Sequence, residues 1–119
     1  MSQLLEGKSA LVLGVANRWS LAYAIAQAYS REGAKVFLTY QSERQRLTVE
    51  ELGAEIGAAK VFACDVTQEA DLKQLEETLR ASVTSLDAVV HSIAFANRDD
   101  LSRPFVETSR EGYLLAQDV

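Results

Sequence analysis

The chain has 119 residues, of which 48% are apolar and 24% are charged, and it carries a net charge of −5. This size suits a single globular unit, and the acidic balance excludes a nucleic-acid partner, whose phosphates require clustered Lys and Arg. The chain has one cysteine, no run of ~20 apolar residues and no signal peptide at its start, so we expect a cytoplasmic protein without disulfides or a membrane partner.

The first half of the sequence alternates apolar runs with amphipathic patterns. Residues 9–13 form a continuous apolar run that predicts a strand buried on both faces, and residues 20–32 place apolar side chains on one stripe of a helix. Residues 35–40 predict a second strand. Residues 42–45 read Ser-Glu-Arg-Gln, a capping-box pattern that is expected to open a second helix reaching about residue 56.

The second half continues this alternation. Residues 60–64 predict a third strand, and Thr67 is expected to cap a third helix whose apolar stripe continues to Val83. Residues 86–91 predict a fourth strand, and residues 108–111 form a second capping-box pattern that opens a last helix. The order of elements predicts an α/β fold with a parallel sheet and right-handed helical crossovers.

The turn after the first strand is the strongest local candidate for a binding site. Gly14 directly follows a buried strand and lets a ligand approach the backbone closely. Ser20 and Leu21 begin the next helix, whose free amides and positive dipole end suit a pyrophosphate. The same residues also fit a plain strand-to-helix turn with a serine cap, because the G-x-G-x-x-G fingerprint is absent.

The ends of the other strands carry further candidates. Gln41 can hydrogen-bond to ribose hydroxyls, and Arg44 nearby either holds a 2′-phosphate or stays solvated. Asp65 either accepts from an adenine amino group or serves as a turn residue. Residues 92–96 are small for the most part and leave room for a ligand. The lone His91 has no metal-ligating partner at suitable spacing, so no metal site is expected.

Four segments at the ends of the predicted strands carry a family resemblance. They are Gly14-x5-Ser20-x-Ala22, Thr39-Tyr40-Gln41, Cys64-Asp65-Val66 and His91-Ser92-Ile93-Ala94-Phe95-Ala96. In this order they resemble the enoyl-acyl-carrier-protein reductases of bacterial fatty-acid synthesis, a divergent branch of the short-chain dehydrogenase/reductase family. The resemblance implies a Rossmann-like doubly wound parallel sheet, truncated here after about four strands. Residues 1–119 would be the N-terminal part of a single dinucleotide-binding domain whose C-terminal half is absent.

The resemblance assigns these strand ends to an NAD(P)H cofactor. The first would hold the pyrophosphate, the second the adenosine ribose, the third the adenine and the fourth the nicotinamide ribose. The implied cofactor-binding residues are Gly14, Ser20, Leu21, Gln41, Asp65, Val66, Ser92, Ile93 and Ala94. Phe95 and Ala96 would face the acyl substrate. Gln41 favours NADH as the cofactor, while Arg44 keeps NADPH open.

The implied reaction is hydride transfer from NAD(P)H to a trans-2-enoyl thioester on acyl carrier protein, in an enzyme that is a homotetramer at full length. In this family a Tyr and a Lys seven residues apart on one helix support the enolate and the cofactor ribose. None of the four tyrosines of this chain has a lysine at that spacing. No stop signal follows the last helical pattern, so we expect the pair to lie beyond residue 119 and the chain alone to be inactive.

Two other functions fit the same elements. One is a stand-alone receiver-like signalling module, since Asp65 ends the third strand. The first strand, however, ends in Gly14-Val15 rather than in an acidic pair able to hold Mg²⁺. The other is a non-catalytic dinucleotide-binding protein. If the chain is instead the half of a longer domain that the resemblance implies, a sheet cut after four strands leaves an unpaired edge and unburied apolar faces, and we expect poor stability or self-association.

Overall fold

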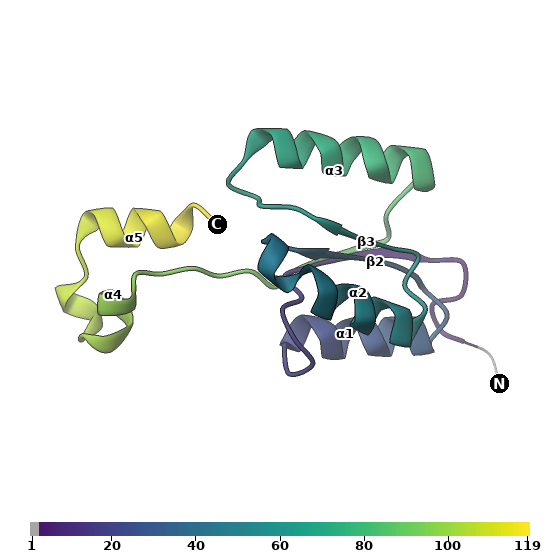
Figure 1. Ribbon diagram of the computed structural model, residues 1–119, viewed down its shortest axis with the longest axis horizontal. Helices are drawn as coiled ribbons and strands as arrows, with labels where there is room; N and C mark the ends of the chain where they lie inside the picture. The colour runs from purple at the N-terminus through teal and green to yellow at the C-terminus, as the bar shows by residue number, and fades with distance from the viewer. Residues whose placement is uncertain (1–2) are drawn as a thin grey trace.

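Four parallel strands form the sheet at the centre of the computed structural model, which describes residues 3–119 (Figure 1). The strands are β1 (Ser9–Leu13), β2 (Lys35–Tyr40), β3 (Lys60–Ala63) and β4 (Ala88–His91). They lie in the order β3-β2-β1-β4, and the register pairs Leu13 with both Thr39 and His91. The carboxyl ends of the strands therefore meet at one edge of the sheet, and the predicted α/β, Rossmann-like fold is confirmed.

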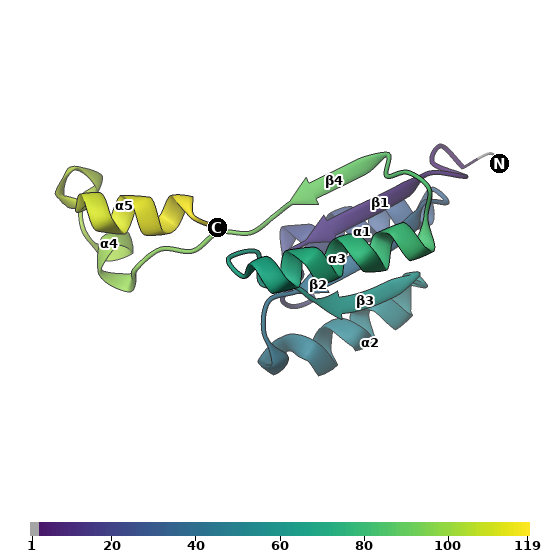
Figure 2. The same cartoon turned by 90° about the horizontal axis from the view of Figure 1, so that it is seen from above.

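Three helices cover the two faces of this sheet. They are α1 (Leu21–Arg31), α2 (Arg46–Ile56), which follows the 3₁₀ turn η1 (Glu43–Gln45), and α3 (Glu69–Ser82). Helices α1 and α2 lie on one face and α3 lies on the other, as the side view in Figure 1 and the view from above in Figure 2 show together. The connections between the strands are therefore the helical crossovers that a parallel sheet requires.

Each face of the sheet has its own apolar core. Val12 and Leu38 face α1 and α2, whereas Leu11 and Phe37 pack with Cys64 toward α3. Neighbouring residues of a strand point to opposite faces, so strands covered on both faces must be apolar throughout. This explains why β1 and β2 are almost fully buried, while the outer strands β3 and β4 keep exposed positions.

Two predicted helix caps are wrong by one residue. Thr67 does not cap α3, because its amide and hydroxyl both donate to Oδ1 of Asp65, at 3.0 and 2.6 Å, and Gln68 occupies the cap position. At many turns an aspartate side chain accepts a hydrogen bond in this way from the backbone amide two residues further along the chain. Helix α5 (Arg110–Gln117) is capped by Ser109, whose Oγ accepts from the Gly112 amide at 3.0 Å.

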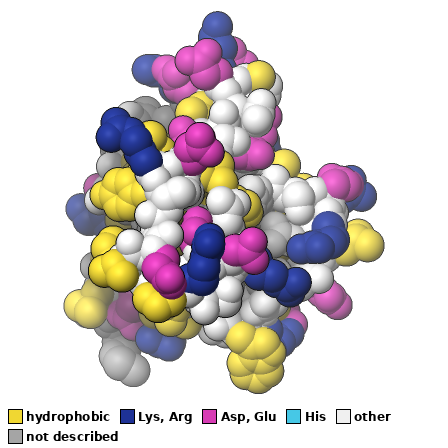
Figure 3. Space-filling model, turned by 90° about the vertical axis from the view of Figure 1, so that its left-hand side faces the viewer, with side chains coloured by type: hydrophobic (Ala, Val, Ile, Leu, Met, Phe, Trp, Pro, Cys, Tyr) yellow, Lys and Arg dark blue, Asp and Glu magenta, His cyan; other side chains and the backbone are white. Residues whose placement is uncertain are grey.

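The chain beyond β4 forms an arm that stands away from the sheet (Figures 1 and 2). An extended segment leads to helix α4 (Arg98–Ser102) and the 3₁₀ turn η2 (Phe105–Glu107), neither of which the sequence predicted, and then to α5. Figure 3 views the molecule from this side and shows apolar side chains among acidic and basic ones. Leu101, Phe105 and Val106 are each more than three-quarters exposed. None of the helices formed by residues 3–119 has the length and apolar character needed to cross a membrane.

Candidate functional site

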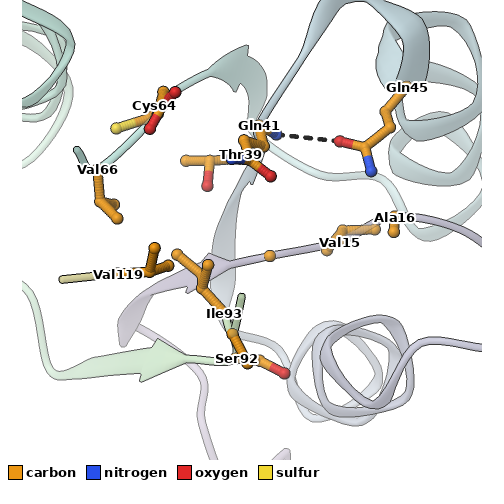
Figure 4. Close-up of a pocket in the computed structure, with 13 residues that line it drawn as sticks. Val15, Ala16, Thr39, Gln41, Gln45, Cys64, Val66, Ser92, Ile93 and Val119 are labelled. Atoms are coloured by element: carbon orange, nitrogen blue, oxygen red, sulfur yellow. Dashed lines mark hydrogen bonds between the residues drawn. The ribbon is translucent and has the colours of Figure 1, made fainter. Parts of the chain in front are cut away.

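A pocket opens at the carboxyl edge of the sheet, where the ends of the four strands meet (Figure 4). Seven of the nine predicted cofactor-binding residues line it, namely Gly14, Gln41, Asp65, Val66, Ser92, Ile93 and Ala94. The pocket is completed by Val15, Ala16, Thr39, Gln45, Cys64 and Val119. Segments that are far apart in the sequence thus converge here because parallel crossovers bring every strand end to the same edge.

Gly14 lets β1 and the segment after β4 approach each other. Its φ is +100°, a conformation that residues with a Cβ rarely adopt. A Cβ at this position would overlap the carbonyl oxygen of Ser92 and would lie 2.8 Å from the carbonyl carbon of Ser92 and 3.1 Å from Cγ1 of Ile93. The Ser92 amide donates to the Leu13 carbonyl at 3.1 Å, which holds the two segments together. Glycine is therefore required by the geometry of the pocket wall.

The loop between β1 and α1 presents free backbone amides. The Ser20 hydroxyl donates to the Asn17 carbonyl at 2.7 Å and makes no capping bond to α1. The amides of Leu21 and Ala22 have no hydrogen-bond partner among residues 3–119. Two free amides at the positive end of a helix suit an anionic ligand. Ser20 and Leu21 do not line the pocket itself, and the Leu21 side chain is 77% exposed.

The same loop is tied to α2 by an ion pair that the sequence analysis did not find. The Arg18 guanidinium donates two hydrogen bonds to the Glu55 carboxylate, at 3.0 and 2.7 Å, and the Tyr23 hydroxyl donates a third at 3.0 Å. The bonds from Arg18 and then from Tyr23 hold the pKa of Glu55 below its usual range. No sequence signal could have revealed this pair, because Arg18 and Glu55 are 37 residues apart.

The end of β2 brings two glutamines to the pocket. Gln41 was predicted; Gln45 was not, although a capping box signals that its last residue folds back over the start of the helix. Oε1 of Gln45 accepts from the amides of Gln41 and Ser42, at 3.2 and 3.4 Å. Arg44 is exposed and does not line the pocket. Arg46, also exposed, forms ion pairs with glutamates of η1 and α2.

The pKa values of Asp65 and Cys64, at the end of β3, are shifted in opposite directions. The hydroxyl and then the amide of Thr67 lower the pKa of the Asp65 carboxyl by donating to Oδ1. Within residues 3–119 no group donates to Oδ2 of Asp65, so this oxygen can accept from a ligand. Cys64 is 2% exposed, and burial, followed by the charges of Asp71 and Asp65, raises the pKa of its thiol. Neither group is suited to exchange a proton near neutral pH, so this part of the site is equipped to bind.

The segment after β4 contributes to the pocket only through its first residues. Ser92, Ile93 and Ala94 line it, whereas Phe95 and Ala96 do not. Phe95 is 49% exposed on the extended stretch that leads into the arm. The two residues predicted to face an acyl substrate are therefore not brought together with the predicted cofactor-binding residues. Among residues 3–119, no three His, Cys, Asp or Glu side chains converge as metal ligands.

Comparisons with known proteins agree on one family. The family model described as Enoyl-(Acyl carrier protein) reductase matches residues 14–119. The chain is 44% identical over 119 residues to the NADH-type enoyl-[acyl-carrier-protein] reductase FabI of Bacillus cereus, covering 98% of this chain and 46% of that protein. It is 40% identical over 117 residues to the NADPH-type FabI of Staphylococcus aureus, covering 97% of this chain and 46% of that protein.

A solved structure extends the likeness to the path of the backbone. The enoyl-(acyl-carrier-protein) reductase of Anaplasma phagocytophilum, in complex with NAD, superposes with a TM-score of 0.92 at 36% identity, covering 99% of this chain and 45% of that one. The chain thus spans a little under half the length of the relatives it matches. The matched region runs from Gly14, at the pocket wall, through the ends of β2, β3 and β4 to Val119. On this agreement of sequence, backbone and pocket, the chain belongs to the enoyl-(acyl carrier protein) reductase family.

Proposed function

We propose that residues 1–119 are the N-terminal part of a single dinucleotide-binding domain in an NADH-dependent enoyl-acyl-carrier-protein reductase of fatty-acid biosynthesis. Its reaction is hydride transfer to a trans-2-enoyl thioester carried by acyl carrier protein. The observation that carries the proposal is the convergence of four strand ends on one pocket, beside free amides at the start of α1. Ligands of open α/β sheets bind in this place.

The chemistry of the pocket fits a dinucleotide. The free amides of Leu21 and Ala22 at the positive end of α1 suit the pyrophosphate, and Gly14 leaves the backbone open to close approach. Gln41 suits the adenosine ribose, and the unpaired Oδ2 of Asp65 suits the adenine amino group. Bound NADH supplies the hydride. The part of this chain is to hold and orient the cofactor, with Ile93 and its neighbours directed toward the nicotinamide ribose.

The pocket supports NADH rather than NADPH as the cofactor. The names of the relatives include both types, NADH in Bacillus cereus and NADPH in Staphylococcus aureus. No lysine or arginine is among the residues that line the pocket within residues 3–119. A 2′-phosphate carries up to two negative charges and is bound in proteins mainly by basic side chains. Neutral Gln41 at the ribose position is therefore consistent with NADH.

The acyl side of the site requires more than these residues. We assign Phe95 and Ala96 to the acyl substrate because they follow directly on the pocket residues, and Phe95 presents half of its surface to solvent. The Tyr–Lys pair of the family is not present in residues 1–119. We therefore expect the 119-residue chain to bind nucleotide without turning over an enoyl thioester. The full-length cytoplasmic enzyme would be a homotetramer.

Calorimetric titration of the chain with NADH, and with its hypoxanthine analogue, tests the proposal. Hypoxanthine replaces the amino group of adenine with a carbonyl, so Oδ2 of Asp65 should favour NADH over the analogue. Asp65→Asn replaces the acceptor oxygen with a donor and should reverse this preference. Asp99→Asn, on the arm outside the pocket, is the matched control and should change nothing. Folded chain that binds neither dinucleotide would refute the proposed function.

A further inference from the structure

The backbone amide of Asp65 points away from the strand that pairs with β3. Within residues 3–119, β3 is an edge strand, and its end is tied to β2 by a bond from the Cys64 amide to the Tyr40 carbonyl at 2.9 Å. Successive amides along a strand point to opposite sides, so the next amide, that of Asp65, faces the free edge. A partly buried amide needs an acceptor, which this one finds outside the sheet.

Asp71 supplies that acceptor from helix α3. Its Oδ2 accepts from the Asp65 amide, with 2.8 Å between the oxygen and the nitrogen. The chain reverses direction between β3 and α3 (Figure 1), and Asp71 lies in the first turn of the helix, so its side chain reaches back across the connection. In a capping box such a side chain returns to the amide of the cap residue. Here it passes the cap, Gln68, and holds the backbone at Asp65 instead.

The side chain of Asp65 is held at the same time by Thr67. The amide and the hydroxyl of Thr67 donate to Oδ1 of Asp65, at 3.0 and 2.6 Å, and Oδ2 is the oxygen left for a ligand. With the backbone held by Asp71 and Oδ1 held by Thr67, the carboxylate cannot turn without breaking one of these bonds. Asp65 lines the pocket, whereas Asp71 and Thr67 do not.

We propose that Asp71 is a positioning residue of the nucleotide site, which acts on the adenine through Asp65. Its hydrogen bond fixes the backbone from which the Asp65 carboxylate is presented to the pocket. The role belongs to the acceptor oxygen of Asp71 and not to its charge. This inference rests on the proposed function and deepens it, because it names the group that sets the direction in which Asp65 meets the amino group of adenine.

Asp71→Ala and Asp71→Asn separate the acceptor from the charge. Alanine removes both, whereas asparagine keeps a carbonyl oxygen that can accept from the Asp65 amide. The wild-type chain should prefer NADH over its hypoxanthine analogue by about tenfold, the equivalent of one good hydrogen bond. Asp71→Ala should reduce this ratio to about twofold, because a hydrogen bond weakens steeply when its acceptor is misaligned. Asp71→Asn should retain the ratio, and calorimetric dissociation constants for the two ligands give it in each variant.

Two further measurements complete the test. Glu69→Ala is the matched control, because it removes an exposed acidic side chain from the same turn of α3 outside the pocket, and it should leave the ratio unchanged. Hydrogen exchange of the Asp65 amide, followed by NMR without ligand, reports on the bond itself. Exchange should be about tenfold faster in Asp71→Ala than in the wild-type chain or in Asp71→Asn.

The outcomes separate the inference from the proposed function. If folded Asp71→Ala weakens both ligands equally and keeps the ratio, Asp71 has only a structural role and the inference is wrong. Loss of the ratio in Asp71→Asn also overturns it, since the charge would then be responsible. If Asp71→Ala does not fold in thermal unfolding, an unprotected Asp65 amide in the wild-type chain is the contradicting result. A wild-type chain that does not bind NADH, or does not prefer it to the analogue, counts instead against the proposed function.

Discussion

Replacing Gly14 with alanine tests the contact on which the pocket geometry depends. The substitution adds a single Cβ, which would overlap the Ser92 carbonyl oxygen and lie 3.1 Å from Cγ1 of Ile93. The backbone at φ +100° costs about 1–3 kcal/mol with any side chain, and forcing two packed segments apart costs about 1–3 kcal/mol more. The expected loss is about 2–6 kcal/mol, a large part of the roughly 5–15 kcal/mol by which domains are stable.

Gly57→Ala is the matched control for this experiment. Gly57 also has a positive φ, +68°, but nothing lies within 4 Å of the position that its Cβ would take. This variant should lose only the backbone term, about 1–2 kcal/mol. Urea unfolding followed by circular dichroism gives both losses, and calorimetry with NADH should show that binding weakens in Gly14→Ala but not in Gly57→Ala. Equal losses of stability in the two variants would refute the close-approach argument.

Three further predictions concern the loop, the thiol and the free strand. Glu55→Gln should lower stability only slightly, because the Arg18 pair is about half exposed and screened by salt. Since the folded pKa of Glu55 is lowered, its contribution is present near neutral pH and is lost as the pH falls through that lowered pKa, so urea midpoints of the two proteins should converge in acid and in high salt. The buried Cys64 thiol, with its raised pKa, should react with a disulfide reagent only as fast as the chain opens, and a native rate equal to that in urea would contradict its burial. Val89 is 59% exposed on β4, an edge strand of the sheet, so Val89→Lys should reduce concentration-dependent association in sedimentation; unchanged association would place the contact elsewhere.

The strands were predictable because their signals are local. Continuous apolar runs correctly located β1 and β2, which are covered on both faces, and β3 and β4 lie within the predicted ranges. Short elements without a periodic apolar pattern were not predicted. Helix α4 spans only Arg98–Ser102 in a polar stretch, so there was no stripe to find. The caps predicted at Thr67 and Thr108 lie one residue before the observed caps, Gln68 and Ser109, since helix ends are assigned only to within a residue or two from local patterns.

The sequence by itself determined the α/β order, the parallel sheet and the convergence of Gly14, Gln41, Asp65 and Ser92, because helical crossovers oblige all strand ends to meet at one edge. Only the tertiary structure decided which side chains complete the pocket. The ion pair between Arg18 and Glu55, which are 37 residues apart, depends on how α1, α2 and the sheet pack, and so does the orientation of the Gln45 amide. Local periodicity carries no information about such contacts. The same holds for Phe95, which directly follows the pocket residues in sequence but does not line the pocket.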